Sequence, residues 1–134
     1  MNRAILLDKG FVLNKPADIS VIQNIMEKYD FTIPPSYVDF LLISNGLYAE
    51  HFVLLELEEI FQRNKDYEID LYLPEYIMIG DDNGGVAILM EFKTGNIYAN
   101  GLGSLLPEDL KFQSKSLEEF LLNENPSVRY YLHS

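Results

Sequence analysis

Residues 81–85 read Asp-Asp-Asn-Gly-Gly, the stretch of the chain that comes nearest to a metal or phosphate loop. Carboxylates are ligands for hard cations, and glycine-rich turns expose backbone N–H groups to anions. The spacing fits neither use, because a calcium loop needs acidic ligands at alternate positions and a phosphate loop needs a lysine after the glycines. The pattern predicts a hairpin turn in which glycine takes a positive φ. We expect no metal and no cofactor.

Two other kinds of residue could serve catalysis. His51 and His133 are the only histidines, and no motif identifies a nucleophile or metal partner for either. Adjacent carboxylates, which a glycosidase could use, occur for example at 58–59 and 118–119. With 21 acidic residues in 134, such pairs are expected by chance. We therefore predict that the protein has no catalytic residues and is not an enzyme.

Acidic residues are concentrated in one segment. Residues 56–82 hold nine Asp or Glu against two Arg or Lys, so they carry a net charge of −7 of the chain's −11. Tyrosines are interleaved with these acids, and tyrosine suits interface anchors because it offers large contact area and a polar tip. Two interpretations stay open: a surface for a basic protein, or a solvated face above tyrosines that pack into the core. Under the first, the residues that contact the partner are Glu68, Asp70, Tyr72 and Glu75.

The composition limits the classes of partner and the compartment. A net charge of −11 repels a phosphate backbone, so we expect no direct binding to nucleic acid, whereas a basic protein surface would be attracted. The chain has no cysteine, which excludes disulfides and thiolate sites and is typical of a reducing compartment, so we expect the cytoplasm. No apolar run is long enough to span a bilayer, and residues 1–10 lack the apolar core of a signal peptide. The oligomeric state stays open.

Two helices are predicted in the first third of the chain. Apolar residues at helical spacing predict a helix over 18–29, with Asp18 or Ser20 as its N-cap. Pro34 and Pro35 favour the start of a second helix, which we expect to stop at residues 45–46 because Gly46 can close a helix. The side chains that we expect this second helix to bury are Tyr37, Val38, Leu41 and Leu42.

The middle of the chain reads as antiparallel sheet. Runs rich in β-branched and aromatic residues at 76–79, 85–92 and 97–99 are separated by turn residues, which predicts three strands joined by hairpins. Residues 85–92 are apolar on both faces, so this strand should be central and covered on both sides. A short strand at 52–57 and a short helix at 58–63 fit their patterns poorly.

The C-terminal third predicts an irregular stretch around Pro107 and then a helix over 116–122. Ser116 and Glu119 in that helix have capping-box spacing. Two helices, then hairpins, then a helix do not alternate as parallel βαβ units do. The fold class is therefore α+β, a single domain over 1–134 with helices packed on one face of an antiparallel sheet.

The order of these features resembles the SUKH superfamily, which includes the fungal cell-wall assembly regulator of the Smi/Knr type. The features are the Pro-Pro-led helix followed by Asn-Gly, the segment Ile-Gly-Asp-Asp-Asn-Gly-Gly at 79–85, and Ser-Leu-Glu-Glu-Phe at 116–120. The resemblance covers about 18–122. The chain departs from it in having no Trp and in the region 52–73, which matches no pattern of the family and is our candidate for partner specificity.

The resemblance implies a non-enzymatic protein-binding domain. Bacterial members are mostly immunity proteins, each of which neutralises a cognate polymorphic toxin by direct binding. We therefore expect an immunity protein whose partner is a basic toxin, for instance a nuclease. The alternative that stays open is a regulatory or scaffold module, which is the use that the fungal relatives make of the fold. An enzyme of unknown type is the third possibility, and it would need a pocket of reactive groups.

Overall fold

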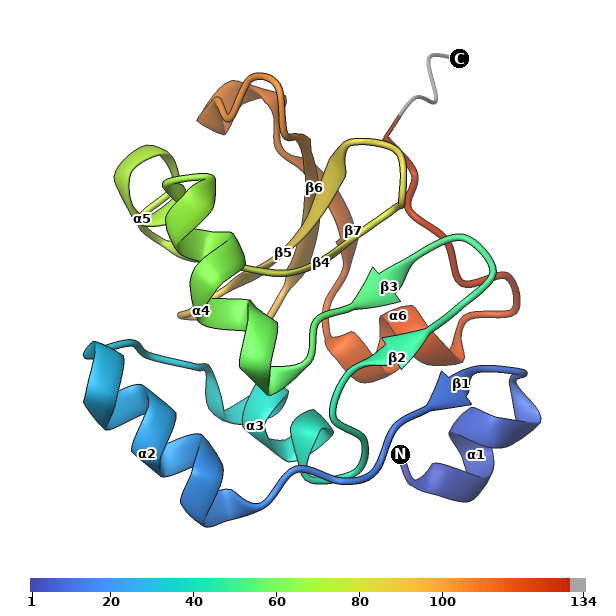
Figure 1. The fold of residues 1–134 in the computed structure, drawn as a ribbon. Coiled ribbons are helices and arrows are strands. Elements are labelled where there is room, and N and C mark those ends of the chain that lie inside the picture. Colours follow the sequence, from blue (N-terminus) through green and yellow to red (C-terminus); the bar gives the residue numbers. More distant parts are fainter. Residues whose placement is uncertain (131–134) are drawn as a thin grey trace.

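The computed structural model describes residues 1–130, and these residues form helices around one antiparallel sheet (Figure 1). The α-helices are α1 Arg3–Asp8, α2 Ile19–Tyr29, α3 Pro35–Leu41, α4 Leu57–Asp66, α5 Ile69–Tyr72 and α6 Leu117–Leu122, with a 3₁₀ turn at Pro107–Asp109. The strands are β1 Val12–Leu13, β2 Leu47–Tyr48, β3 Val53–Leu54, β4 Tyr76–Asp81, β5 Val86–Glu91, β6 Ile97–Gly101 and β7 Lys111–Ser114.

The sheet is a meander in which each strand pairs with the strand before it in the sequence. Its order is β1-β2-β3-β4-β5-β6-β7, and every pair is antiparallel. Helices α2 and α3 lie in the connection from β1 to β2, and α4 and α5 lie in the connection from β3 to β4 (Figure 1). The domain is therefore α+β, which confirms the predicted class.

Strand β5 is the centre of the core. Its residues 86–90 are all fully buried, so both faces of the strand are covered, as the apolar pattern predicts. Met90 lies near α3, where the Ser36 hydroxyl is 3.2 Å from its sulfur, and its neighbour Leu89 pairs with Met78 of β4. Because successive side chains of a strand point to opposite faces, β5 joins the packing on the two sides of the sheet.

The two helices with the clearest capping signals form where the sequence predicts them. Asp18 is the N-cap of α2, and its carboxylate accepts a hydrogen bond from the Ser20 amide at 2.8 Å. Ser116 is the N-cap of α6, and its hydroxyl accepts from the Glu119 amide at 3.0 Å. Each cap satisfies an N–H group that the helix leaves without an internal partner.

The prediction for α3 is wrong at its C-terminal end. The helix ends at Leu41, several residues before Gly46. Leu42, which was expected to be buried, is 38% exposed, and Phe40, which was not expected in the core, is fully buried. Gly46 does take a positive φ of 78°, but it does not close the helix. Its backbone lies close to that of Leu54, because a Cβ at residue 46 would lie 2.7 Å from the Leu54 carbonyl oxygen. The glycine therefore lets the chain enter β2 beside β3.

Several elements were not predicted because they are short or polar. Strands β1 and β2 have two residues each, too few for a period to show, and β7 has the mixed sequence Lys-Phe-Gln-Ser. Helix α1 and the single turn of α5 were also missed. Pairing with a neighbouring strand and packing on the core hold such segments in place, and neither is visible in a local pattern.

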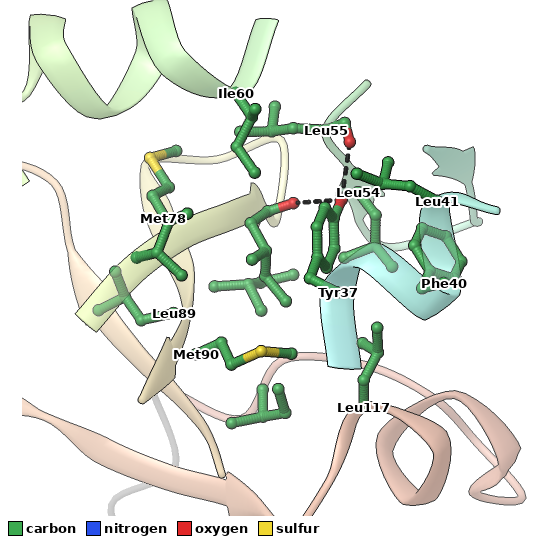
Figure 2. Packing of buried hydrophobic residues seen from close by; sticks show 14 of the residues in the cluster. Tyr37, Phe40, Leu41, Leu54, Leu55, Ile60, Met78, Leu89, Met90 and Leu117 are labelled. Carbon is green, nitrogen blue, oxygen red and sulfur yellow. Dashed lines mark hydrogen bonds between the residues drawn. The ribbon is translucent and has the colours of Figure 1, made fainter. Parts of the chain in front are cut away.

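Tyr37 places a polar atom in the middle of the apolar core. Its ring is fully buried, and its hydroxyl donates to the Leu55 carbonyl oxygen at 2.7 Å and lies 3.3 Å from that of Ile79 (Figure 2). Burial raises the pKa of this phenol well above its ordinary value of 10. The neutral hydroxyl therefore links α3 to the strand region where β3 and β4 meet.

Replacing Tyr37 by Phe tests this link. We expect Tyr37→Phe to lower the free energy of unfolding by about 1–2 kcal/mol, because the Leu55 carbonyl loses its buried donor while the ring packing is kept. Urea unfolding followed by circular dichroism measures the change. A variant as stable as the parent would contradict the structural role of the hydroxyl.

Candidate partner-binding groove

A groove of about 820 Å³ opens between the turn from α2 to α3, helices α4 and α5, and the ends of β4 and β5 that lie beside them. These elements meet on the left side of Figure 1. The lining residues are Tyr29, Asp30, Phe31, Thr32, Phe61, Asn64, Lys65, Asp66, Glu68, Asp70, Pro74, Tyr76, Ile77 and Phe92. The groove is thus built from aromatic and acidic side chains that come from four separate parts of the chain.

Helix α4 is fixed to β4 by two polar contacts that shape the groove. The side-chain amide of Asn64 donates to the Met78 carbonyl at 2.9 Å, and its oxygen accepts from the Met78 amide at 2.8 Å. Arg63 donates to the Asp81 carboxylate at 2.6 Å. Strand β3 pairs with β4 only at Gly80 and Asp81. The Asn64 side chain therefore makes the two hydrogen bonds to the Met78 backbone that a neighbouring strand would otherwise make.

Aromatic rings that pack on one another form one wall. The Tyr29 ring stacks on that of Phe61 with centroids 4.1 Å apart, and Phe31 meets Phe61 edge-on at 5.4 Å. On the sheet side, Tyr76 meets Tyr98 edge-on at 5.4 Å. Partial burial and the nearby Glu91 raise the pKa of Tyr76 above 10, so its phenol is neutral at physiological pH. The rings are therefore held in place from both sides of the groove.

Four carboxylates lie at the groove: Asp30, Asp66, Glu68 and Asp70. Asp66 accepts a hydrogen bond from Gln62 at 2.7 Å, while the other three side chains make no hydrogen bond or salt bridge within residues 1–130. Lys65 is the one basic residue of the lining. The lining consequently carries four carboxylates against one lysine, a net charge of −3, and has a negative field.

Residues 16–123 match the model of the SMI1 / KNR4 family (SUKH-1), which is about four fifths of the chain. The chain belongs to the SUKH-1 family. This confirms the resemblance drawn from the sequence over 18–122. Comparison with curated proteins gives no match. Within residues 1–130 of this SUKH-1 chain, no helix is long and apolar enough to cross a membrane.

The four residues predicted to contact a partner are all exposed in this SUKH-1 domain, but they do not form one site. Glu68 and Asp70 line the groove, whereas Tyr72, which is 50% exposed, and Glu75 lie outside its lining. Tyr76, the first residue of the strand predicted at 76–79, was not among the predicted contact residues, and it does line the groove. Whether any of them contacts a partner stays a prediction.

The hairpin predicted at 81–85 joins β4 to β5. The Asp82 carboxylate accepts from the amides of Gly84 at 2.8 Å and Val86 at 2.9 Å, and Asn83 and Gly85 take positive φ. These acids therefore stabilise the turn itself. No group of three His, Asp or Glu side chains that could hold a metal occurs among residues 1–130.

His51 is exposed at the turn between β2 and β3, 3.8 Å from the Glu50 carboxylate. His133 lies outside the described residues.

Sequence reasoning missed the aromatic wall and one of the acids. Tyr29 counted only toward the apolar spacing that predicts a helix over 18–29, and Phe61 and Phe92 were not singled out as site residues, because each is far from the others in the sequence. Asp30 was not singled out either, although it directly follows the predicted helix; in the structure it caps α2 in a left-handed conformation with φ of 48°. Only the fold, which brings α2, α4 and β5 to one place, shows that these residues share a surface.

Proposed function

We propose that this SUKH-1 domain is an immunity protein that neutralises a cognate polymorphic toxin by stoichiometric binding in the cytoplasm, without catalysis. The observation that supports the proposal best is the groove, whose aromatic wall and uncompensated carboxylates are open to a partner. Aromatic side chains supply contact area, and carboxylates without internal partners favour a cationic surface. A basic toxin, for instance a nuclease with a positive phosphate-binding surface, has that complement.

A regulatory or scaffold module is the alternative, because fungal relatives of the SUKH superfamily use the fold in that way. Both functions require a protein partner, and the groove suits either. They differ in what the partner does when the domain is absent. A toxin kills the cell that makes it, whereas a scaffold partner leaves the cell alive.

Co-expression distinguishes the two. The protein encoded beside this chain is produced in cells with and without it, viability is scored, and a tagged copy of the chain is used to isolate a complex. We expect the neighbour to be toxic alone, and co-expression to restore growth with a one-to-one complex. A neighbour that is toxic and neither bound nor neutralised would overturn the immunity function. A bound neighbour without toxicity would favour the scaffold.

Charge reversal tests which surface binds. In the double variant Glu68→Lys with Asp70→Lys, we expect the association rate with the toxin to fall by about ten-fold or more, because opposite charges steer encounter and like charges oppose it. Stopped-flow or surface-based kinetics at low salt measure the rate. Glu50→Lys is the matched control, since its side chain is 87% exposed on the turn between β2 and β3, across the molecule from α5 in Figure 1. Equal rates for both variants would contradict this assignment.

A further inference from the structure

The groove combines aromatic rings and free carboxylates, and this combination specifies the occupant more narrowly than negative charge alone. We propose that the groove binds an arginine side chain presented by the protein partner. The inference rests on the proposed function in one respect, which is that the partner is a protein. It adds the chemical group that the groove recognises.

The aromatic wall suits a flat cation. Phe61 contacts two other rings: Tyr29 stacks on it at 4.1 Å, and Phe31 meets it edge-on at 5.4 Å. Rings fixed by such neighbours need little reordering when a ligand arrives. A guanidinium group stacks on aromatic faces and gains a cation–π attraction there, and it gives up its hydration more readily than an ammonium group does.

The carboxylates suit the same group. Asp30 comes from the turn after α2, whereas Glu68 and Asp70 come from the segment of α5, so the acids approach from two separate connections. None of the three has a side-chain partner within residues 1–130. A guanidinium offers five donors in a planar fork that matches a carboxylate with two parallel hydrogen bonds. Rings and acids are both among the lining residues that an arginine in the groove would meet.

Other occupants use only part of the groove. A lysine ammonium is compact and strongly hydrated, so it would meet the acids without stacking on the rings. An apolar side chain would stack but would remove water from carboxylates without replacing it. An anion would be repelled. Lys65, which lines the groove, opposes every cationic occupant, and its removal should therefore favour arginine.

The test uses the full chain labelled with ¹⁵N and a blocked Gly/Ser peptide that carries a pair of arginines. Two matched peptides replace arginine by lysine or by citrulline, which keeps the shape of arginine without its charge. We expect saturable NMR shifts of groove amides with the arginine peptide, a Kd for the lysine peptide at least about three-fold higher, and no shifts with citrulline. Equal Kd values for arginine and lysine would overturn the proposal, as would shifts located outside the groove.

Variants locate the contact. Glu68→Gln combined with Asp70→Asn should raise the Kd of the arginine peptide by about ten-fold, and Lys65→Gln should lower it by about two-fold, whereas Glu50→Gln should leave it unchanged. An equal effect of Glu50→Gln would mean general charge attraction and would overturn the proposal. The outcome is separable from that of the immunity function. A toxin that is bound and neutralised while the arginine peptide does not bind disproves the inference alone, and specific peptide binding without protection disproves the function alone.

Discussion

Gly80→Ala is expected to lower the free energy of unfolding by at least about 3 kcal/mol, the largest effect on stability that we predict for a single methyl group. Gly80 lies in β4 just after an irregularity in its pairing with β5, and opposite Leu54 of β3. A Cβ at this position would lie 2.1 Å from the Val53 carbonyl oxygen. Because that atom belongs to the backbone of the neighbouring strand, the clash is relieved only by moving β3 away from β4.

Urea unfolding of the variant measures the effect, and Gly103→Ala is the matched control. Gly103 has no positive φ, and a Cβ there meets no atom within 4 Å, so its replacement should change stability by less than about 0.5 kcal/mol. A Gly80→Ala variant as stable as this control would contradict the close approach of the Val53 carbonyl to Gly80.

The second large effect concerns Asn64, which is only 6% exposed and holds α4 against β4. Asn64→Leu should lower the free energy of unfolding by about 2–4 kcal/mol, because the amide and the carbonyl of Met78 both lose their partner. The Ile60 carbonyl, to which the same amide donates at 2.8 Å, loses a hydrogen bond as well. Urea unfolding at neutral pH provides the measurement, and no loss would mean that water replaces the amide at no cost.

Asn64→Asp tests the donor role of the Asn64 side chain separately, because aspartate keeps the oxygen that accepts from Met78 and loses the NH₂ group that donates to the carbonyls. The new carboxyl can accept from Met78 but faces two carbonyls, and burial adds to this, so its folded-state pKa should rise above its unfolded value of about 4. A raised acid pKa means that the folded state prefers the protonated form. The loss of stability relative to the parent should therefore be small below pH 4, should grow as the pH rises, and should level off above the folded pKa. An equal loss at pH 4 and pH 7 would contradict this account.

Local patterns in the sequence were enough to predict the fold class and its central elements. Helix α2 has both an apolar period and an N-cap at Asp18, and β5 is apolar on both faces, so each is specified by its own residues. Helix α5 has a single turn and begins after Glu68, which takes a left-handed φ of 53°. Contacts with α4 and β4, which no local pattern records, decide its position.

The groove was predictable only in part, and for the same reason. The acidic segment pointed to Glu68 and Asp70, because charge density can be read along a chain. The aromatic partners of these acids could not be found in this way, since Phe31, Phe61 and Phe92 come together only when two connections fold against the ends of β4 and β5. The charge of the groove could therefore be predicted from the sequence, whereas its aromatic residues could be identified only from the fold.

The meander also places most of the groove outside the sheet. Most of the groove belongs to the two helical connections, β1 to β2 and β3 to β4, while the sheet supplies only Tyr76, Ile77 and the adjacent Phe92. Strand pairing follows sequence order, so exposed residues in these connections can change without altering the register of β4, β5 and β6. A library that varies the exposed positions 30, 32, 65, 66, 68 and 70 on a constant sheet is thus a direct route to domains with new binding preferences.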